Sequence, residues 1–169
     1  MQKEQDRRKI VISLLVAASV VALDQLSKLW IKNNPHGVEL LPGFLDFVYV
    51  ENYGSAFGLF ANQTFILITI IVASLIIILL FLYLSSPATT LSIVAVGLIL
   101  GGALGNLIDR LQYGYVTDFI DVHLQNLYHW YTFNLADTAI VIGILTFIYS
   151  LYRSGLFNKA YKNGHRSKD

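Results

Sequence analysis

The chain has 169 residues, of which 55% are hydrophobic and 14% are charged, whereas about a quarter of the residues in an ordinary soluble domain are charged. The net charge is +1 and most basic residues lie near the two ends, so nothing indicates a nucleic-acid partner. The chain has no cysteine, which excludes disulfides, thiolate metal sites and a cysteine nucleophile. The four histidines lack the spacing of a helical metal-binding pair. The composition therefore indicates an integral membrane protein.

The first long apolar segment covers residues 10–31 and is long enough to cross a bilayer, because a membrane-spanning helix needs about 20 mostly apolar residues. A competing interpretation is a cleaved signal peptide over residues 1–22, since a basic start and an apolar stretch lead to the passable cleavage site Val20-Val21-Ala22. Cleavage would leave three spans and would place one terminus on the other side of the membrane.

The connection over residues 32–63 contains strand and turn signals. Residues 44–50 alternate and are rich in aromatic and branched side chains, which is typical of a strand. Asn52-Tyr53-Gly54 is a turn signal, and residues 56–60 are predicted to form either a partner strand or an interfacial segment. We expect a small sheet on the outer membrane surface.

Two further apolar segments, 64–84 and 91–108, are separated by only six residues, which predicts an antiparallel hairpin. On the second of them, Gly97, Gly101 and Gly105 recur every four residues. Such a stripe lets helix backbones approach closely in lipid. The glycines resemble a phosphate-binding loop only superficially, because they lie within a span and do not follow a strand, so we expect packing and not nucleotide binding.

The fourth apolar segment covers residues 135–151. Asn134 is typical of a helix N-cap, and Asp137 then falls at the third helical position, where the helix dipole favours a carboxylate. We therefore predict an all-α membrane protein, a single integral domain over residues 1–169 with four transmembrane helices and a small β-sheet and loop region on the extracytoplasmic side.

Lysine and arginine residues predict the orientation of the chain. They gather before the first span and after the last one, as Lys3, Arg7, Arg8, Lys9, Arg153, Lys159, Lys162, Arg166 and Lys168. Cytoplasmic segments carry an excess of these residues. We therefore expect both termini in the cytoplasm and both long connections, 32–63 and 111–134, outside.

Polar and ionisable residues gather at the predicted outer ends of the spans, and such residues within or beside a membrane indicate function. They are Asp24 and Lys28 on the first span, Asn106, Asp109 and Arg110 on the third, Asp118 and Asp121 in the following loop, and Asn134 and Asp137 at the start of the fourth. A transporter or proton channel needs polar groups along its whole path, and the inner halves carry almost none. A non-enzymatic scaffold would have no evident need for this one-sided cluster.

Several of these residues also have a structural interpretation. Asp24 and Lys28 have the i, i+4 spacing of a helical ion pair, and direct contact with a ligand is the alternative. Asp109 and Arg110 are adjacent, so they point in different directions on a helix and are suited to support neighbouring loops. Helix capping accounts for Asn134 and for an aspartate at position 137. It does not account for a second aspartate, Asp118, only 19 residues earlier.

Two carboxylates held close together are sufficient for hydrolysis. Their mutual repulsion leaves the pair with one shared proton. The ionised member takes a proton from water, and the protonated member donates to the carbonyl oxygen of the scissile bond. The pair titrates as a unit, so we assign the proton to neither aspartate. A Gly-x-Ser-x-Gly elbow and an HExxH pair are absent from the sequence, which disfavours serine and metallohydrolases.

Five motifs follow one another along the chain. They are Leu23-Asp24-Gln25 with Lys28, Asn52-Tyr53-Gly54-Ser55-Ala56-Phe57, Gly105-Asn106-Leu107-Ile108-Asp109-Arg110, Val116-Thr117-Asp118-Phe119 and Phe133-Asn134-Leu135-Ala136-Asp137. In this order, over about residues 20–140, they resemble the lipoprotein signal peptidases (type II signal peptidases) of bacteria.

The resemblance implies an aspartic endopeptidase of the bacterial inner membrane with its active site near the extracytoplasmic face. The substrate would be a diacylglyceryl-modified prolipoprotein, cut N-terminal to the lipidated cysteine. The catalytic residues would be Asp118 and Asp137, and the residues that shape the site would be Asn52, Gly54, Asn106, Asp109, Arg110 and Asn134, with Asp24 and Lys28 on the first span. The resemblance further implies a monomer among membrane lipids, without metal or cofactor, that is inhibited by globomycin-like cyclic peptides.

Overall fold

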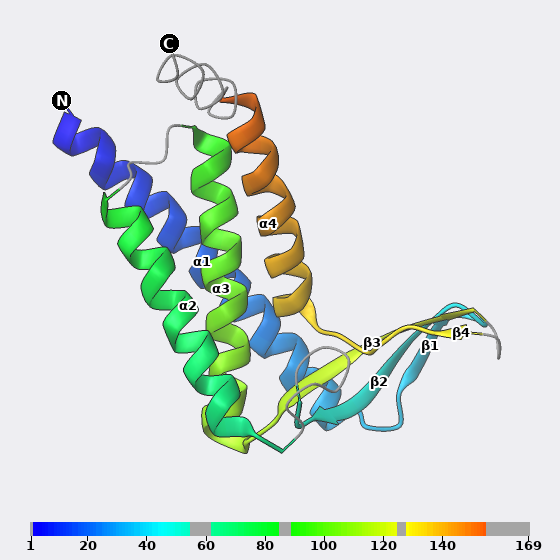
Figure 1. Ribbon diagram of the computed structural model, residues 1–169. Coiled ribbons are helices and arrows are strands. Elements are labelled where there is room, and N and C mark those ends of the chain that lie inside the picture. Colours follow the sequence, from blue (N-terminus) through cyan, green and yellow to red (C-terminus); the bar gives the residue numbers. More distant parts are fainter. Residues whose placement is uncertain (1, 55–61, 85–88, 125–127, 155–169) are drawn as a thin grey trace, which may run out of the picture.

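The structure is a computed structural model that describes residues 2–54, 62–84, 89–124 and 128–154. The described residues form a helical bundle from which a small sheet projects at one end (Figure 1). The helices are α1 (Gln2–Asn33), α2 (Thr64–Leu84), α3 (Thr90–Tyr113) and α4 (Leu135–Arg153). The strands are β1 (Val38–Leu41), β2 (Leu45–Asn52), β3 (Val116–Leu124) and β4 (Tyr128–His129). The helices α2 and α3 run antiparallel beside each other, as the short connection predicts.

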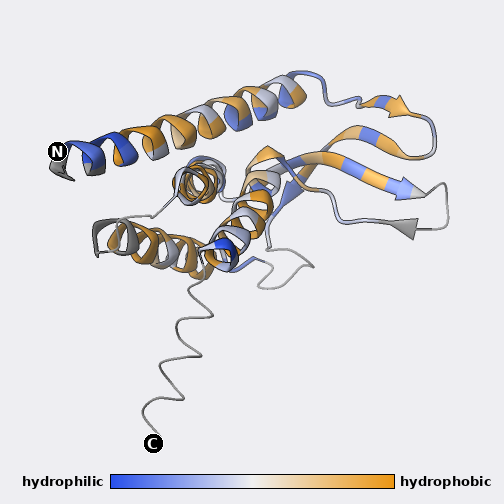
Figure 2. Cartoon of the chain, turned by 90° about the horizontal axis from the view of Figure 1, so that it is seen from above, coloured by the Kyte–Doolittle hydropathy of each residue, from blue (hydrophilic) through white to orange (hydrophobic). Residues whose placement is uncertain are grey.

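Within the part of the chain that the structure describes, three helices are long and apolar enough to cross a membrane, over Arg7–Asn33, Thr90–Tyr113 and Leu135–Arg153. A fourth apolar stretch, Thr64–Leu80 on α2, is shorter. Figure 2 shows hydrophobic residues along much of each helix, with hydrophilic residues in the first turns of α1 and again toward its other end. The mostly helical membrane fold is thus confirmed, whereas the fourth span and the sidedness stay predictions.

The helix α3 lies at the centre of the bundle. About 61% of its most apolar stretch is buried, against 17% for α1 and 22% for α4. Its glycines explain how the neighbouring helices come so close. A Cβ atom at Gly97 would lie 2.7 Å from the carbonyl oxygen of Ser13, and one at Gly101 would lie 2.6 Å from Val20 Cβ. The predicted packing role of the glycine stripe is confirmed, with α1 as the helix that it contacts.

The sheet is antiparallel, with the strand order β1-β2-β3-β4. The predicted strand 44–50 is present as β2, which begins one residue later and ends at Asn52. The prediction that residues 118 and 121 lie in a loop is wrong, because both belong to β3, which pairs with β2. Proximity to a distant strand stabilises β3, and local sequence carries no such information. The segment 56–60, predicted as a strand or interfacial segment, lies outside the described residues.

Aromatic contacts attach the sheet to the bundle. The ring of Phe47 on β2 contacts Trp30 of α1 at 6.2 Å and Phe119 of β3 at 5.7 Å between centroids, both edge to face. At the end of α3, Gly114 adopts the left-handed conformation (φ 80°), and its N–H donates to the carbonyl of Arg110. This turn directs the chain from the centre of the bundle into β3.

Candidate active site

A cavity of about 870 Å³ lies between α2, α3 and α4, close to the start of β3. Aliphatic side chains make up much of its wall, including Ile71 and Ile78 of α2 and Ile140 and Ile144 of α4. Its charged and amide lining residues are Asn52, Asn106, Arg110, Asp118 and Asp137. The two aspartates that the sequence singles out therefore face one cavity, although they come from a strand and a helix.

Both oxygens of Asp118 accept hydrogen bonds from asparagine amides. The Nδ2 atom of Asn134 donates to Oδ1 at 2.7 Å, and Nδ2 of Asn52 donates to Oδ2 at 2.7 Å. The residue is 1% exposed. Burial, followed by the nearby charge of Asp137, raises the pKa of Asp118 to about 7, although the two amide donors favour its ionised form. At neutral pH this carboxyl group can therefore hold or release a proton.

Asp137 occupies the third position of α4 and takes part in a capping box. The Asn134 side chain accepts from the N–H of Asp137 at 2.9 Å, and Asp137 Oδ2 accepts from the N–H of Asn134 at 3.4 Å. The predicted N-cap is confirmed. Capping is not the whole role of Asn134, because its amide also donates to Asp118.

Asn106 of α3 bonds directly to Asp137 and to the buried Lys28, and it is linked to Asp118 through Asn134. Its Nδ2 atom donates to Asp137 Oδ1 at 2.7 Å, and its Oδ1 atom accepts from Lys28 Nζ and from Asn134 Nδ2, both at 3.1 Å. An ammonium group can only donate, so Lys28 fixes the orientation of the Asn106 amide. The donor end of that amide must then face Asp137.

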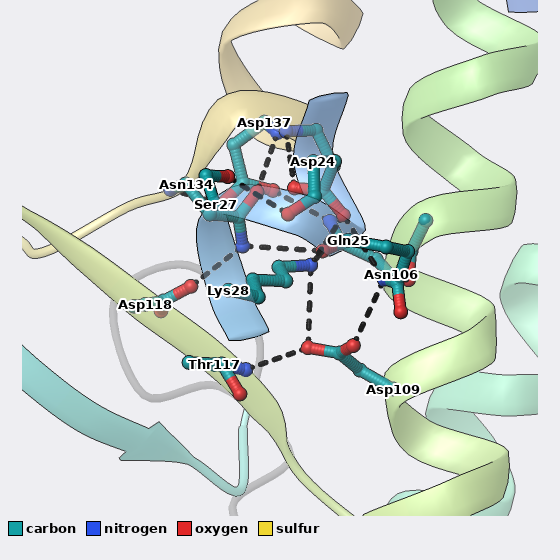
Figure 3. A network of polar contacts seen from close by, with 12 residues as sticks. Asp24, Gln25, Ser27, Lys28, Asn106, Asp109, Thr117, Asp118, Asn134 and Asp137 are labelled. Atoms are coloured by element: carbon teal, nitrogen blue, oxygen red, sulfur yellow. Dashed lines mark hydrogen bonds and ion pairs between the residues drawn. The ribbon is translucent and has the colours of Figure 1, made fainter. Parts of the chain in front are cut away.

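Lys28 lies in a buried ionic cluster (Figure 3). Its Nζ atom is 2.8 Å from Asp24 Oδ2 and 3.2 Å from Asp109 Oδ2, which confirms the predicted i, i+4 ion pair and adds a second carboxylate. The three side chains are at most 2% exposed. With Asn106, these partners use all three donors of the ammonium group.

The same cluster holds the strand and the helix that carry the candidate aspartates. Asp24 Oδ1 accepts from the N–H of Ala136 at the start of α4 at 3.0 Å. Asp109 Oδ2 accepts from the N–H of Thr117 in β3 at 2.8 Å. Neither acid, nor Lys28, lines the cavity. The structural interpretation of Asp24 and Lys28 thus fits the geometry better than direct ligand contact.

Arg110 points in a different direction from Asp109, as adjacent helical residues must. It lines the cavity, and its guanidinium donates to the carbonyl of Gly54 at 2.9 Å. The N–H of Gly54 in turn donates to Asn52 Oδ1 at 2.9 Å. Because this oxygen is occupied, the amino group of Asn52 is directed toward Asp118. Ser55, the next residue of the same motif, lies outside the described residues.

Sequence reasoning assigned no role to Gln25. Its Nε2 atom donates to Asp109 Oδ1 at 3.0 Å and to the carbonyl of Gly105 at 3.2 Å, so it links α1 with α3 beside the ionic cluster. The sequence did contain a signal for this role, because an amide side chain next to Asp24 is unusual within a predicted span. Asp121, in contrast, does not line the cavity.

Comparisons with known proteins place the chain in a family. The family model described as signal peptidase (SPase) II matches residues 16–153. The chain belongs to the signal peptidase II family. It is 43% identical over 157 residues to the lipoprotein signal peptidase of Syntrophotalea carbinolica, covering 88% of this chain and 96% of that protein. With that of Moorella thermoacetica it shares 47% identity over 143 residues, covering 82% and 91%.

A solved structure supports the same assignment to the signal peptidase II family. A bacterial membrane enzyme determined by the in meso method at 2.3 Å resolution superposes with a TM-score of 0.78 at 33% identity, covering 87% of this chain and 90% of that one. The chain is therefore a membrane peptidase, and the family recognised from its motifs is confirmed. The match over residues 16–153 includes every residue of the site described above.

Proposed function

We propose that this chain is an aspartic endopeptidase that removes the signal peptide from diacylglyceryl-modified prolipoproteins, with Asp118 and Asp137 as the catalytic pair. The observation that carries the proposal is the placement of both carboxylates at one apolar cavity. Amide groups of three asparagines orient them. Family membership and the lipoprotein signal peptidases among the relatives support the substrate class.

In the proposed mechanism the pair begins the reaction with one proton. The ionised carboxylate takes a proton from water, and the resulting hydroxide attacks the scissile carbonyl carbon while the other carboxyl group donates its proton to the carbonyl oxygen. The tetrahedral intermediate then collapses: one of its hydroxyl groups returns a proton to the ionised carboxylate, the C–N bond breaks, and the protonated carboxyl group gives its proton to the leaving amine, so that the pair again holds one proton. Burial of Asp118, followed by its repulsion with Asp137, raises the pKa of Asp118 to about 7, so the pair keeps its one proton near neutral pH. These steps need no metal ion and no cofactor.

The apolar wall suits the proposed substrate. A signal peptide presents an apolar segment, and the diacylglyceryl group adds two acyl chains, so both match the aliphatic side chains of α2 and α4 that line the cavity. Such a substrate lies within the bilayer. An active site between helices can therefore receive it directly from the surrounding lipid.

The proposed arrangement in the bacterial inner membrane follows from charge and from the position of the sheet. We propose one domain over residues 1–169 with four spans and both termini in the cytoplasm, because the basic residues flank the first and last spans. The strand β3 carries Asp118 and the start of α4 carries Asp137. Both elements lie toward the end of the bundle that is opposite the start of α1 (Figure 1), which would be the extracytoplasmic end. A single chain contains both aspartates, so a monomer suffices.

The proposed substrate is tested by comparing two forms of one precursor, with and without the diacylglyceryl group. The purified protein in detergent micelles is expected to cleave only the lipidated form, N-terminal to the modified cysteine, and globomycin is expected to block cleavage. The product mass locates the cut. Equal cleavage of both forms would contradict recognition of the lipid, and no cleavage of either would overturn the peptidase proposal.

The value of kcat/KM for cleavage is expected to fall as the pH rises above about 7, which forms the alkaline limb of the pH profile. Because the pKa of Asp118 is raised to about 7, the pair keeps its proton below this pH. Above it the pair loses the proton needed by the carbonyl oxygen, so kcat/KM falls. An Asn52→Leu variant removes a donor that favours ionised Asp118, and should move this limb to higher pH. The exposed Asn34→Ala change serves as control, and a limb that stays in place in Asn52→Leu would contradict the assignment.

A further inference from the structure

A second cluster of ionisable side chains lies on the sheet, away from the cavity. It consists of Asp46 on β2 and Asp121 and His123 on β3, and one ligand atom from each lies within 4.8 Å of the other two. Asp46 and Asp121 are direct cross-strand partners. Side chains alternate along a strand, so Asp121 and His123 share one face of β3, and Asp118 belongs to the other.

Three acids meet on this face of the sheet. Glu39 of β1 is the cross-strand partner of Asp46, so three acids lie side by side across β1, β2 and β3. Like charges directly opposite each other destabilise a sheet. The Oδ1 atom of Asp46 is also buried and has no hydrogen-bond partner among the described residues. A bound cation would satisfy this oxygen and offset the repulsion.

One nitrogen of His123 and one oxygen of each carboxylate are close enough for small side-chain rotations to bring all three onto one ion. His123 Nδ1 is 3.6 Å from Asp121 Oδ2, and Nε2 is 3.9 Å from Asp46 Oδ2, so each carboxylate lies near a different ring nitrogen, and only one of these nitrogens can bind the ion. Donor atoms around one zinc ion lie about 3.4 Å apart, given bonds of about 2.1 Å at the tetrahedral angle. The His123 side chain is 10% exposed, so it is already ordered within the sheet.

We propose that Asp46, Asp121 and His123 form a binding site for a divalent transition-metal ion, with Zn²⁺ as the best match. One imidazole nitrogen and one oxygen from each carboxylate are a ligand set that zinc accepts, and water completes the coordination. Calcium prefers six to eight oxygen ligands, so it fits less well. The ion would join β2 to β3, the strands that supply Asn52 and Asp118 to the cavity. No sequence motif indicates this site, because its ligands come from segments about 75 residues apart.

Zinc binding is measured directly by isothermal titration calorimetry on the purified full chain in detergent micelles. We expect one Zn²⁺ per chain, and we expect Asp46→Asn and His123→Ala each to weaken binding by roughly 100-fold or more, since even changes beside a metal site cost 10- to 100-fold. Glu39→Gln is the matched control, because it removes a charge beside the site but no ligand. It should bind nearly as tightly as the unmodified chain.

A second measurement needs no variant. Zinc, but not an equal concentration of Ca²⁺, should slow amide hydrogen exchange in β2 and β3 of the unmodified chain. Absence of stoichiometric zinc binding would overturn the proposal. Equal weakening in Glu39→Gln and Asp46→Asn would also overturn it, because general electrostatic attraction would then explain binding. Neither measurement depends on cleavage, so the result is independent of the proposed function.

Discussion

Replacing Asp118 or Asp137 with asparagine is expected to lower the rate of precursor cleavage by about 10³-fold or more, since each change removes a group that transfers a proton. An amide can neither share the proton nor take one from water. The initial rate with lipidated precursor measures the effect. In the double variant the loss should be about as large as in either single one, because residues that act as a unit are not additive.

The matched control for these variants is Glu51→Gln, the same kind of change at an exposed position on β2 next to Asn52. Its cleavage rate should equal that of the unmodified chain. In Asp118→Asn, one of the two amide donors loses its acceptor oxygen, which costs about 1–3 kcal/mol of stability. Thermal unfolding must therefore confirm that the variant is folded. Substantial activity in a folded Asp118 or Asp137 variant would exclude the aspartate pair as the catalyst.

Replacing Lys28 with methionine is expected to destabilise the protein by about 3–5 kcal/mol, the usual cost of removing one partner from a buried ion pair. Asp24 and Asp109 would remain buried without their cation. The free energy of unfolding in detergent micelles measures this effect. Cleavage should fall as well, because the two acids hold the N–H groups of Ala136 and Thr117.

Two further variants separate charge compensation from loss of side-chain packing. Lys32→Met lies one turn further along α1, where the ammonium group stacks over the ring of Tyr113, and it should cost only about 1 kcal/mol. Adding Asp24→Asn and Asp109→Asn to Lys28→Met should recover part of the lost stability, since no charge then remains in the cluster of Asp24, Lys28 and Asp109. If the triple variant is less stable than Lys28→Met, the buried charges are not the cause.

Features that depend on neighbouring residues could be predicted from the sequence. Hydropathy located the helices to within a few residues at most ends, although α3 continues to Tyr113 and not 108. The Asn134 cap, the Asp24–Lys28 pair and the strand β2 were likewise correct. Each of these depends on residues a few positions apart, so the local sequence contains the necessary information.

Contacts between distant segments could not be predicted in this way. The bond from Asn106 to Asp137 joins residues 31 positions apart, and the bond from Asn52 to Asp118 joins residues 66 apart. The strand β3 was assigned to a loop because its stability comes from pairing with β2. The motif series could identify Asp118 and could name Asn52 and Asn134 as residues that shape the site, but it could not show the hydrogen bonds by which their amides orient Asp118.

The sequence by itself determined that this is a membrane protein and, through its motifs, to which family it belongs, since hydropathy and motif order are properties of the linear chain. Only the tertiary structure decided which ionisable residues line the cavity and which form ionic contacts elsewhere. It placed Asp118 and Asp137 at one apolar cavity and Asp24, Lys28 and Asp109 in a buried cluster behind it. It brought Asp46, Asp121 and His123 together on the sheet. The physical reason is that burial and charge compensation arise only when helices and strands pack against each other.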